Sequence, residues 1–360
     1  MKTGKSLTEL AAELDRQNKE KHDYVASTTH LEMKVEDDRT KIGGDAKLKL
    51  HVDGHGEFPL REIAHDQIAG RLQIPSKYYD RMRTEAPALL ARNVNHWFRE
   101  KPEARMVRTM DGSARAFLSD RFRPIENYDI GRVTIETLLG MKAKVESAEI
   151  TEKRMYIKAF APALTTKIPI VGDVVSAGII VTNSEVGHGA FKVEPMVMVL
   201  RCTNGLIANM ASMKRYHVGR RHMEFEEATE LFTNATREAD DKVLMMKARD
   251  IVQGAFQRAT FEAIVQKMSD AFQNKITAKV VDAVEVTREK FGLRDEEKDD
   301  ILQVLIRRGD LSQYGLVDAI TEASQRVDDY DRATELERLG GVVLELPQRD
   351  WSEIAEAKAA

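Results

Sequence analysis

The residues best suited to chemistry gather between positions 181 and 222. This stretch holds the only cysteine, three of the nine histidines and a glycine-rich turn. Ser184, Glu185 and His188 are side-chain types that can act as nucleophile, acid and base. A Ser–His–acid triad needs groups brought together from separate elements, however, and these three lie within one short turn. We therefore interpret them as turn and core residues and assign no catalytic residue.

Cys202 offers a second kind of chemistry. A nucleophilic thiol needs a neighbouring base, for which His188 or His217 could serve. A single cysteine at the end of an apolar strand is more typical of buried packing. The chain also lacks the GxSxG and Walker A motifs. A cysteine-dependent hydrolase of nucleic acid stays open as an alternative, behind a non-catalytic function.

His51, Asp53 and His55 alternate along a predicted strand, which would place all three on one face. Such groups can bind a metal ion, and His188 with a carboxylate could also contribute to a metal-dependent hydrolase. A polar edge strand that runs into a glycine turn gives the same pattern. We therefore predict no metal site and no cofactor, and keep the metal-dependent enzyme as an alternative.

The main functional signal is a basic, aromatic cluster over 214–222, with the sequence KRYHVGRRH. Cationic side chains can neutralise phosphates, and flat rings can stack on bases. The residues predicted to bind nucleic acid are Arg121, Arg123, Lys192, Arg201, Lys214, Arg215, Tyr216, His217, Arg220 and Arg221. We predict a single-stranded DNA-binding or strand-annealing protein. The competing interpretation is a solvated basic turn neutralised by the glutamates that follow it.

The composition limits where such a function can lie. The formal net charge is −4 at pH 7, so any nucleic-acid surface must be a local patch. A single cysteine excludes a disulfide framework and a multi-cysteine zinc site, and it suits a reducing compartment. No apolar run has the length of a signal peptide's core or of a membrane span. These features predict a cytoplasmic protein that does not bind membranes.

Local signals predict the first elements of the fold. Ser6 and Glu9 have the spacing of a capping box at the start of a helix. Two further helices are predicted on either side of Pro75. The dipeptide Asp111-Gly112 is a strong turn signal and predicts a β-hairpin. The apolar segment 174–183 is rich in β-branched residues, which predicts a central strand buried on both faces.

After Phe225 the pattern becomes helical, with a short strand predicted at 342–346. The fold class is therefore α+β, with a mostly antiparallel mixed sheet and flanking helices, followed by a helical C-terminal region. The predicted divisions are an α+β core domain over 1–225, a helical region over 226–346 and a loosely ordered tail over 347–360. The charged C-terminal helices could also bind a protein partner or form a homo-oligomer, which is a third functional hypothesis.

Five segments together carry a family resemblance: IPSKYYDRM, LSDRFRPIENYDI, TNSEVGHGAFKV, LRCTNGL and YHVGRRH. With them the chain resembles the phage- and plasmid-borne family catalogued as domain of unknown function 932, from about Leu60 into the helical C-terminal half. The resemblance implies a mobile element, where recombination and strand annealing are common functions. It supplies no activity for the motif residues, which are Asn183, Ser184, Glu185, Gly187, Cys202, Asn204, Gly205 and His217. We interpret most of these residues as structural.

Overall fold

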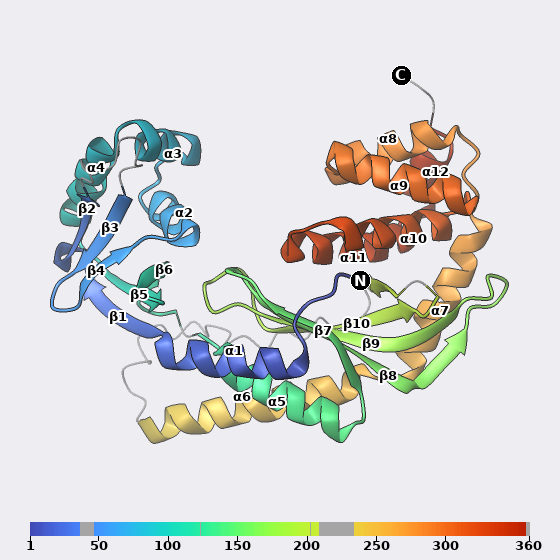
Figure 1. Ribbon diagram of the computed structural model, residues 1–360, viewed down its shortest axis with the longest axis horizontal. Coiled ribbons are helices and arrows are strands. Elements are labelled where there is room, and N and C mark those ends of the chain that lie inside the picture. Colours follow the sequence, from blue (N-terminus) through green and yellow to red (C-terminus); the bar gives the residue numbers. More distant parts are fainter. Residues whose placement is uncertain (37–46, 123, 202, 209–233, 358–360) are drawn as a thin grey trace.

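The computed structural model describes residues 1–36, 47–122, 124–201, 203–208 and 234–357. Within these residues the chain is an α+β protein with three parts (Figure 1): an N-terminal lobe, a central five-stranded sheet and a group of C-terminal helices. The lobe and the C-terminal helices stand apart, on the left and right of Figure 1, and both rise above the level of the sheet. No described helix is long and apolar enough to cross a bilayer.

Helix α1 (Leu7–Glu20) precedes the N-terminal lobe and carries the predicted capping box. The Ser6 hydroxyl accepts a hydrogen bond from the Glu9 amide at 3.3 Å, and the Glu9 carboxylate accepts one from the Ser6 amide at 2.8 Å. Leu10 and Leu14 form the buried stripe of this helix, one turn apart. The local sequence therefore sets both where α1 begins and which face it buries.

Two small antiparallel sheets and three helices build the N-terminal lobe. The strands are β1 (His22–Ser27), β5 (Ala104–Met110) and β6 (Ser113–Ser119) in the first sheet, and β2 (Leu31–Glu36), β3 (Lys47–Val52) and β4 (Gly56–Pro59) in the second. The helices are α2 (Glu62–Arg71), α3 (Ser76–Glu85) and α4 (Pro87–Glu100). At the predicted β5–β6 turn, Asp111 and Gly112 have φ of 53° and 67°, the positive values that a type I′ turn requires. The core of the lobe contains Val94, Phe98 and Phe117.

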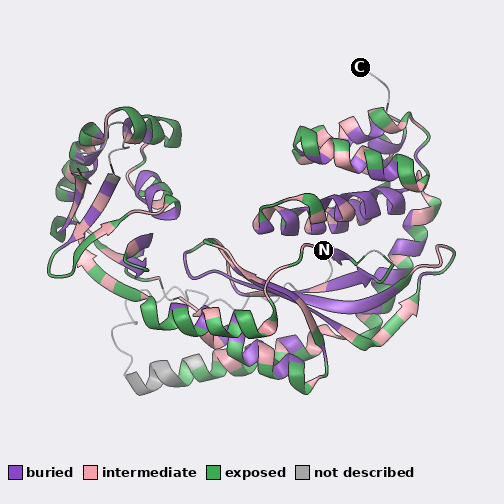
Figure 2. Cartoon of the chain, in the orientation of Figure 1, coloured by how far each residue is buried: buried purple, intermediate pink, exposed green. Residues whose placement is uncertain are grey.

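The central sheet is antiparallel with strand order β11-β10-β9-β8-β7. Its strands are β7 (Lys144–Ile150), β8 (Met155–Lys167), β9 (Val174–Asn183), β10 (Lys192–Val199) and β11 (Asn204–Ile207). β9 is the middle strand and is buried on both faces, as its apolar sequence predicts (Figure 2). Because successive side chains alternate, Ile179 and Val181 pack with α1, α5 (Asn127–Gly140) and α6 (Asn234–Ala255), while Ile180 faces Tyr330 on the opposite side.

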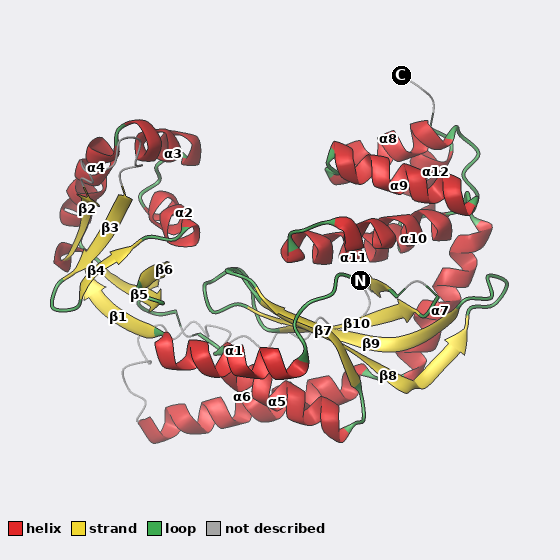
Figure 3. Ribbon diagram, in the orientation of Figure 1, coloured by secondary structure: helices red, strands yellow, loops and turns green. Residues whose placement is uncertain are grey.

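The C-terminal helices pack around one apolar core that also includes side chains of β9, β10 and β11. They are α7 (Arg258–Gln273), α8 (Val280–Phe291), α9 (Asp295–Arg308), α10 (Gln313–Ala323), α11 (Tyr330–Leu344) and α12 (Gln348–Ala355), as Figure 3 shows. The predicted boundary at residue 225 lies outside the described residues.

Two local predictions at the C-terminus differ from the structure. Residues 342–346 form no strand, because Val343 and Leu344 complete α11 and are buried in the helical core. The tail after Pro347 contains α12, whose Trp351 and Ile354 are buried in the same core. Their spacing of three residues places both on one helical face. For both short segments, tertiary packing against the helical core determines the secondary structure.

Candidate functional sites at the lobe junction and on helix α4

The segment over 183–187 joins the sheet to neighbouring elements immediately after β9. Asn183 donates from Nδ2 to the backbone oxygen of Ile125 at 2.7 Å, which fixes the chain entering α5. The Ser184 hydroxyl accepts from the amide of His188 at 2.9 Å and so closes the turn. Both side chains are buried. These two motif residues are therefore engaged within the fold.

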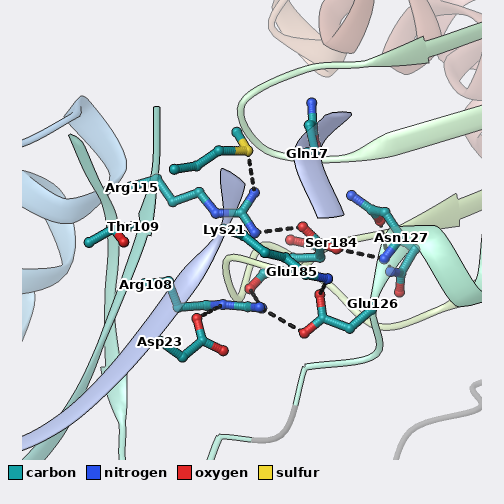
Figure 4. A network of polar contacts seen from close by, with 12 residues as sticks. Gln17, Lys21, Asp23, Arg108, Thr109, Arg115, Glu126, Asn127, Ser184 and Glu185 are labelled. Carbon is teal, nitrogen blue, oxygen red and sulfur yellow. Dashed lines mark hydrogen bonds and ion pairs between the residues drawn. The ribbon is translucent and has the colours of Figure 1, made fainter. Parts of the chain in front are cut away.

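Glu185 connects the sheet to the N-terminal lobe (Figure 4). Its Oε2 lies 2.6 Å from Nη2 of Arg115 on β6, and its Oε1 accepts from the amide of Asn127 at 2.6 Å. The side chains of Glu185 and Arg115 are only 4% and 8% exposed. Burial raises the pKa of Glu185, and the charge of Arg115 opposes that rise by favouring the carboxylate.

Arg108 on β5 makes a second connection across the junction (Figure 4). Its guanidinium donates to Asp23 at 2.8 Å, to Glu126 at 2.8 Å and to the backbone oxygen of Glu185 at 2.9 Å. Lys21 approaches the other oxygen of Glu126 at 2.6 Å. Burial alone would raise the pKa of Glu126, but Arg108, a hydrogen bond with Glu185, and Lys21 lower it to about 2. Three cationic and three acidic side chains therefore meet at this junction.

An apolar contact and a glycine complete the junction. Val186 is buried against Ile63 and Leu118 of the lobe. Gly187 has φ of +80°, and a Cβ there would lie 3.0 Å from Leu118. Both the left-handed backbone and the tight contact favour glycine at this position.

The second motif segment attaches the C-terminal helices to the opposite end of the sheet. Asn204 opens β11, is buried, and donates from Nδ2 to Oδ1 of Asp318 on α10 at 2.8 Å. A Cβ on Gly205 would overlap the side chain of Met196. Cys202 lies outside the described residues. The two motif segments thus hold two attachments, one for each outer part of the protein.

The structure places two described members of the predicted nucleic-acid site, Lys192 and Arg201, far apart. Lys192 and Arg201 flank opposite ends of β10, whose eight residues span roughly 26 Å. Arg201 lies 3.2 Å from Asp173 and is ion-paired with it. Arg121 is exposed in the segment after β6. The other predicted members, Arg123, Lys214, Arg215, Tyr216, His217, Arg220 and Arg221, lie outside the described residues.

The predicted metal-capable group lies at the β3–β4 turn. The imidazole of His51 is 3.2 Å from Asp53, and His55 instead stacks on Tyr24 with ring centroids 4.3 Å apart. Among the described residues no three His, Cys, Asp or Glu side chains gather in a way that could hold a metal ion. The metal-dependent alternative therefore has no ligand set in this part of the chain.

Helix α4 exposes a basic, aromatic surface that the sequence prediction missed. Arg92, His96 and Arg99 are all exposed and follow the i, i+4, i+7 spacing of one helical face. Trp97 is 38% exposed, and the ammonium of Lys101 lies 5.5 Å from its ring centroid. We call these five residues the α4 surface. The residue types of this surface are visible in the sequence ARNVNHWFREK, but an apolar Trp97 gives no local sign of its exposure.

Among the described residues, the cations of the α4 surface lack the carboxylate partners that neutralise cations elsewhere in the lobe. Arg92, Arg99 and Lys101 form no ion pair with any residue that the structure describes, and Glu100 is the only acidic residue on α4. By contrast, Arg81 on the neighbouring helix pairs with Glu85 at 2.9 Å. Arg92, His96 and Arg99 therefore form a basic stripe on one face of α4, and Lys101 places a further cation beside the exposed indole of Trp97.

The fold and its two attachments define the class: an α+β protein in which a lobe and a set of helices are fixed to one antiparallel sheet. A family model described as Domain of unknown function (DUF932) matches residues 116–342, more than half of the chain. The chain belongs to this family. No curated protein and no solved structure matches it. The matched range includes both motif segments, whereas the α4 surface precedes it.

Proposed function

We propose that this protein binds single-stranded nucleic acid, in particular single-stranded DNA of a phage or other mobile element, and acts in strand binding or annealing. The observation that carries the proposal is the α4 surface, where the cations form no ion pair with a described residue and the ammonium of Lys101 lies 5.5 Å from the exposed ring of Trp97. A backbone of phosphates supplies the missing negative charge, and a base supplies a flat partner for the indole. The predicted cluster over 214–222 has the same chemistry.

A single strand suits this surface better than a duplex. Bases inside a duplex are stacked on one another, so an exposed ring gains a base contact only from a strand whose bases are free. Trp97 stands out from α4 together with His96, whose ring centroid is 5.2 Å away. Arg92 lies about one turn before these rings along the helix and Arg99 less than one turn after them, where they can follow a backbone.

Salt-dependent binding is the primary test. Fluorescence anisotropy with a labelled oligothymidine should show affinity that falls steeply with salt. The double variant Arg92→Gln/Arg99→Gln should reduce the slope of log affinity against log salt by about 1.4, because each lost phosphate contact on a single strand contributes about 0.7. Arg81→Gln is the matched control, since Arg81 is exposed in the same lobe but is paired with Glu85. Absence of salt-sensitive binding by the unaltered protein would refute the proposal.

Tryptophan fluorescence gives an independent reading of the same surface. The chain has two tryptophans, and Trp351 is 2% exposed in the helical core, so Trp97 is the tryptophan whose emission a stacked base can quench. Oligothymidine should quench the emission, and Trp97→Phe should abolish this quenching. If binding survives every change on α4 but is lost in Lys214→Gln/Arg215→Gln, the function belongs to the 214–222 cluster instead.

A further inference from the structure

Two turns of the central sheet bring cationic groups together. They lie on the side of the sheet that faces the N-terminal lobe and the C-terminal helices. The β7–β8 turn carries Lys153 and Arg154, and the β9–β10 loop carries His188. Arg154 donates from Nε to the backbone oxygen of His188 at 2.9 Å, which ties the two turns to each other. Figure 1 shows both turns extending from the sheet toward the N-terminal lobe. We call Lys153, Arg154 and His188 the fork cluster.

The cations of the fork cluster have no ion-paired carboxylate among the described residues. Lys153 is exposed and Arg154 is half-buried. Of the nearby acids, Asp331 on α11 accepts from the hydroxyls of Tyr156 at 2.6 Å and Thr151 at 3.2 Å.

Two other acids lie close to the fork cluster. Glu152 lies 4.0 Å from Arg61 and is ion-paired with that residue. Asp66 on α2 is exposed and acts on His188 only through its charge. The fork cluster therefore keeps positive charge that these carboxylates do not take up directly.

The electrostatics of His188 fit this arrangement. Burial lowers the pKa of His188, and the charges of Lys153 and Arg154 lower it further, while Asp66 and Asp331 act weakly in the opposite direction. A bound anion would reverse the effect of the two cations and favour the imidazolium.

Two glycines shape the loop around the imidazole. Gly187 and Gly189 have φ of +80° and +141°, and a Cβ on Gly189 would stand 3.6 Å from Nε of Arg154. A side chain at position 189 would therefore extend from a point in contact with the guanidinium, which glycine avoids. The backbone that glycine permits is a recurring feature of anion-binding loops.

We propose that the fork cluster binds a phosphate group, with Lys153 and Arg154 as the cations and His188 as a hydrogen-bond donor. This site lies within the matched family region and is separate in sequence from the α4 surface. It does not depend on the proposed function, because the same groups would hold a free phosphate or the phosphodiester of a strand. The ligand chemistry is a tetrahedral phosphate with at least one charged oxygen.

The test uses the full chain and two probes, inorganic phosphate and an oligothymidine without terminal phosphates. Binding is measured by calorimetry, and the His188 ring signal is followed by NMR after assignment with His188→Gln. We expect Lys153→Gln to weaken binding of the active probe about tenfold, the effect of losing one charge-assisted contact. Lys19→Gln is the control, since Lys19 is an exposed lysine on α1 that forms no ion pair with a described residue.

The pH profile separates ligand contact from a structural effect. Binding of the unaltered protein should weaken as the pH rises through the pKa of His188, beyond any change caused by titration of the probe, and His188→Gln should lose that component. Saturable binding of inorganic phosphate identifies a free phosphate. If only the oligonucleotide binds, and Lys153→Gln weakens that binding, the ligand is the phosphodiester backbone of a strand.

Two results would overturn the proposal. The first is no perturbation of His188 by either probe. The second is equal binding by Lys153→Gln and Lys19→Gln. If the α4 double variant loses oligonucleotide affinity in that second case, the proposed function stands without the fork site.

Discussion

Replacing Arg115 with methionine tests the lobe junction directly. The substitution removes the ion-pair partner of Glu185, whose side chain is 4% exposed and would keep its hydrogen bonds with the Asn127 amide and with Glu126. Breaking a buried pair by removing one partner costs about 3–5 kcal/mol. Nε of Arg115 is itself buried without an acceptor, which already costs the native junction about 1 kcal/mol. We therefore expect a loss near the lower end, about 3 kcal/mol in the free energy of unfolding.

Urea unfolding at pH 7 measures this loss, with two controls. Arg81→Met breaks a pair whose members are 69% and 61% exposed, and it should cost less than about 1 kcal/mol. The double variant Arg115→Met/Glu185→Gln should recover most of the lost stability, because a neutral amide can still accept from the Asn127 amide. A loss below 1 kcal/mol for Arg115→Met, or no recovery in the double variant, would refute the importance of the buried charge.

The pH dependence has a defined sign. Burial already raises the pKa of Glu185, and loss of Arg115 raises it further. A carboxyl with a raised folded-state pKa favours folding while protonated in both states, and its contribution is lost as pH rises through the folded pKa. The cost of Arg115→Met should therefore shrink as pH falls from 7 toward 4. Glu126 changes the stability of the folded protein in the opposite direction. Because its folded-state pKa is lowered to about 2, its carboxylate contributes stability that is lost as pH falls from 4.5 toward 2. A cost that does not change with pH would contradict this account.

Two further predictions concern the sheet and its helices. Lys158 and Glu337 form a 2.6 Å pair with both side chains 0% exposed, so Lys158→Met should cost about 3–5 kcal/mol, whereas Lys158→Met/Glu337→Leu should recover most of it in thermal melts. Gly178→Ala would overlap the Phe160 ring and should destabilise by about 1–3 kcal/mol, while Gly70→Ala has open space in α2 and should stabilise by up to about 1 kcal/mol. Equal melting temperatures of the two glycine variants would contradict this packing.

Local chemistry made much of the fold predictable. The capping box at Ser6, the turn at Asp111 and the apolar run of β9 each act within a few residues, and all three are present in the structure. The α+β class followed from such signals taken in order. The strand predicted at 342–346 failed because β-branched residues in a short run fit a buried helix equally well, and only packing against the helical core decides between the two.

The candidate sites were harder to predict because their parts come from distant positions. Glu185 meets Arg115 across 70 residues of chain, and no local pattern marks that pair. The residue types over 183–187 predict a turn. They do not predict that this turn attaches the N-terminal lobe to the central sheet. The α4 surface was missed for another reason: Trp97 is apolar, and the sequence does not show how α4 is rotated against β2.

Buried charge recurs where the parts of this protein meet. Arg115–Glu185 joins the lobe to the sheet, and Lys158–Glu337 joins α11 to the sheet. Such pairs add little net stability over apolar residues of the same size, because desolvation offsets most of their attraction. They do impose direction, since a guanidinium or ammonium must meet its carboxylate at hydrogen-bond distance, whereas apolar side chains can slide past one another. The attachments therefore fix orientation more than they add stability, and the positions of the α4 surface and the fork cluster depend on that orientation.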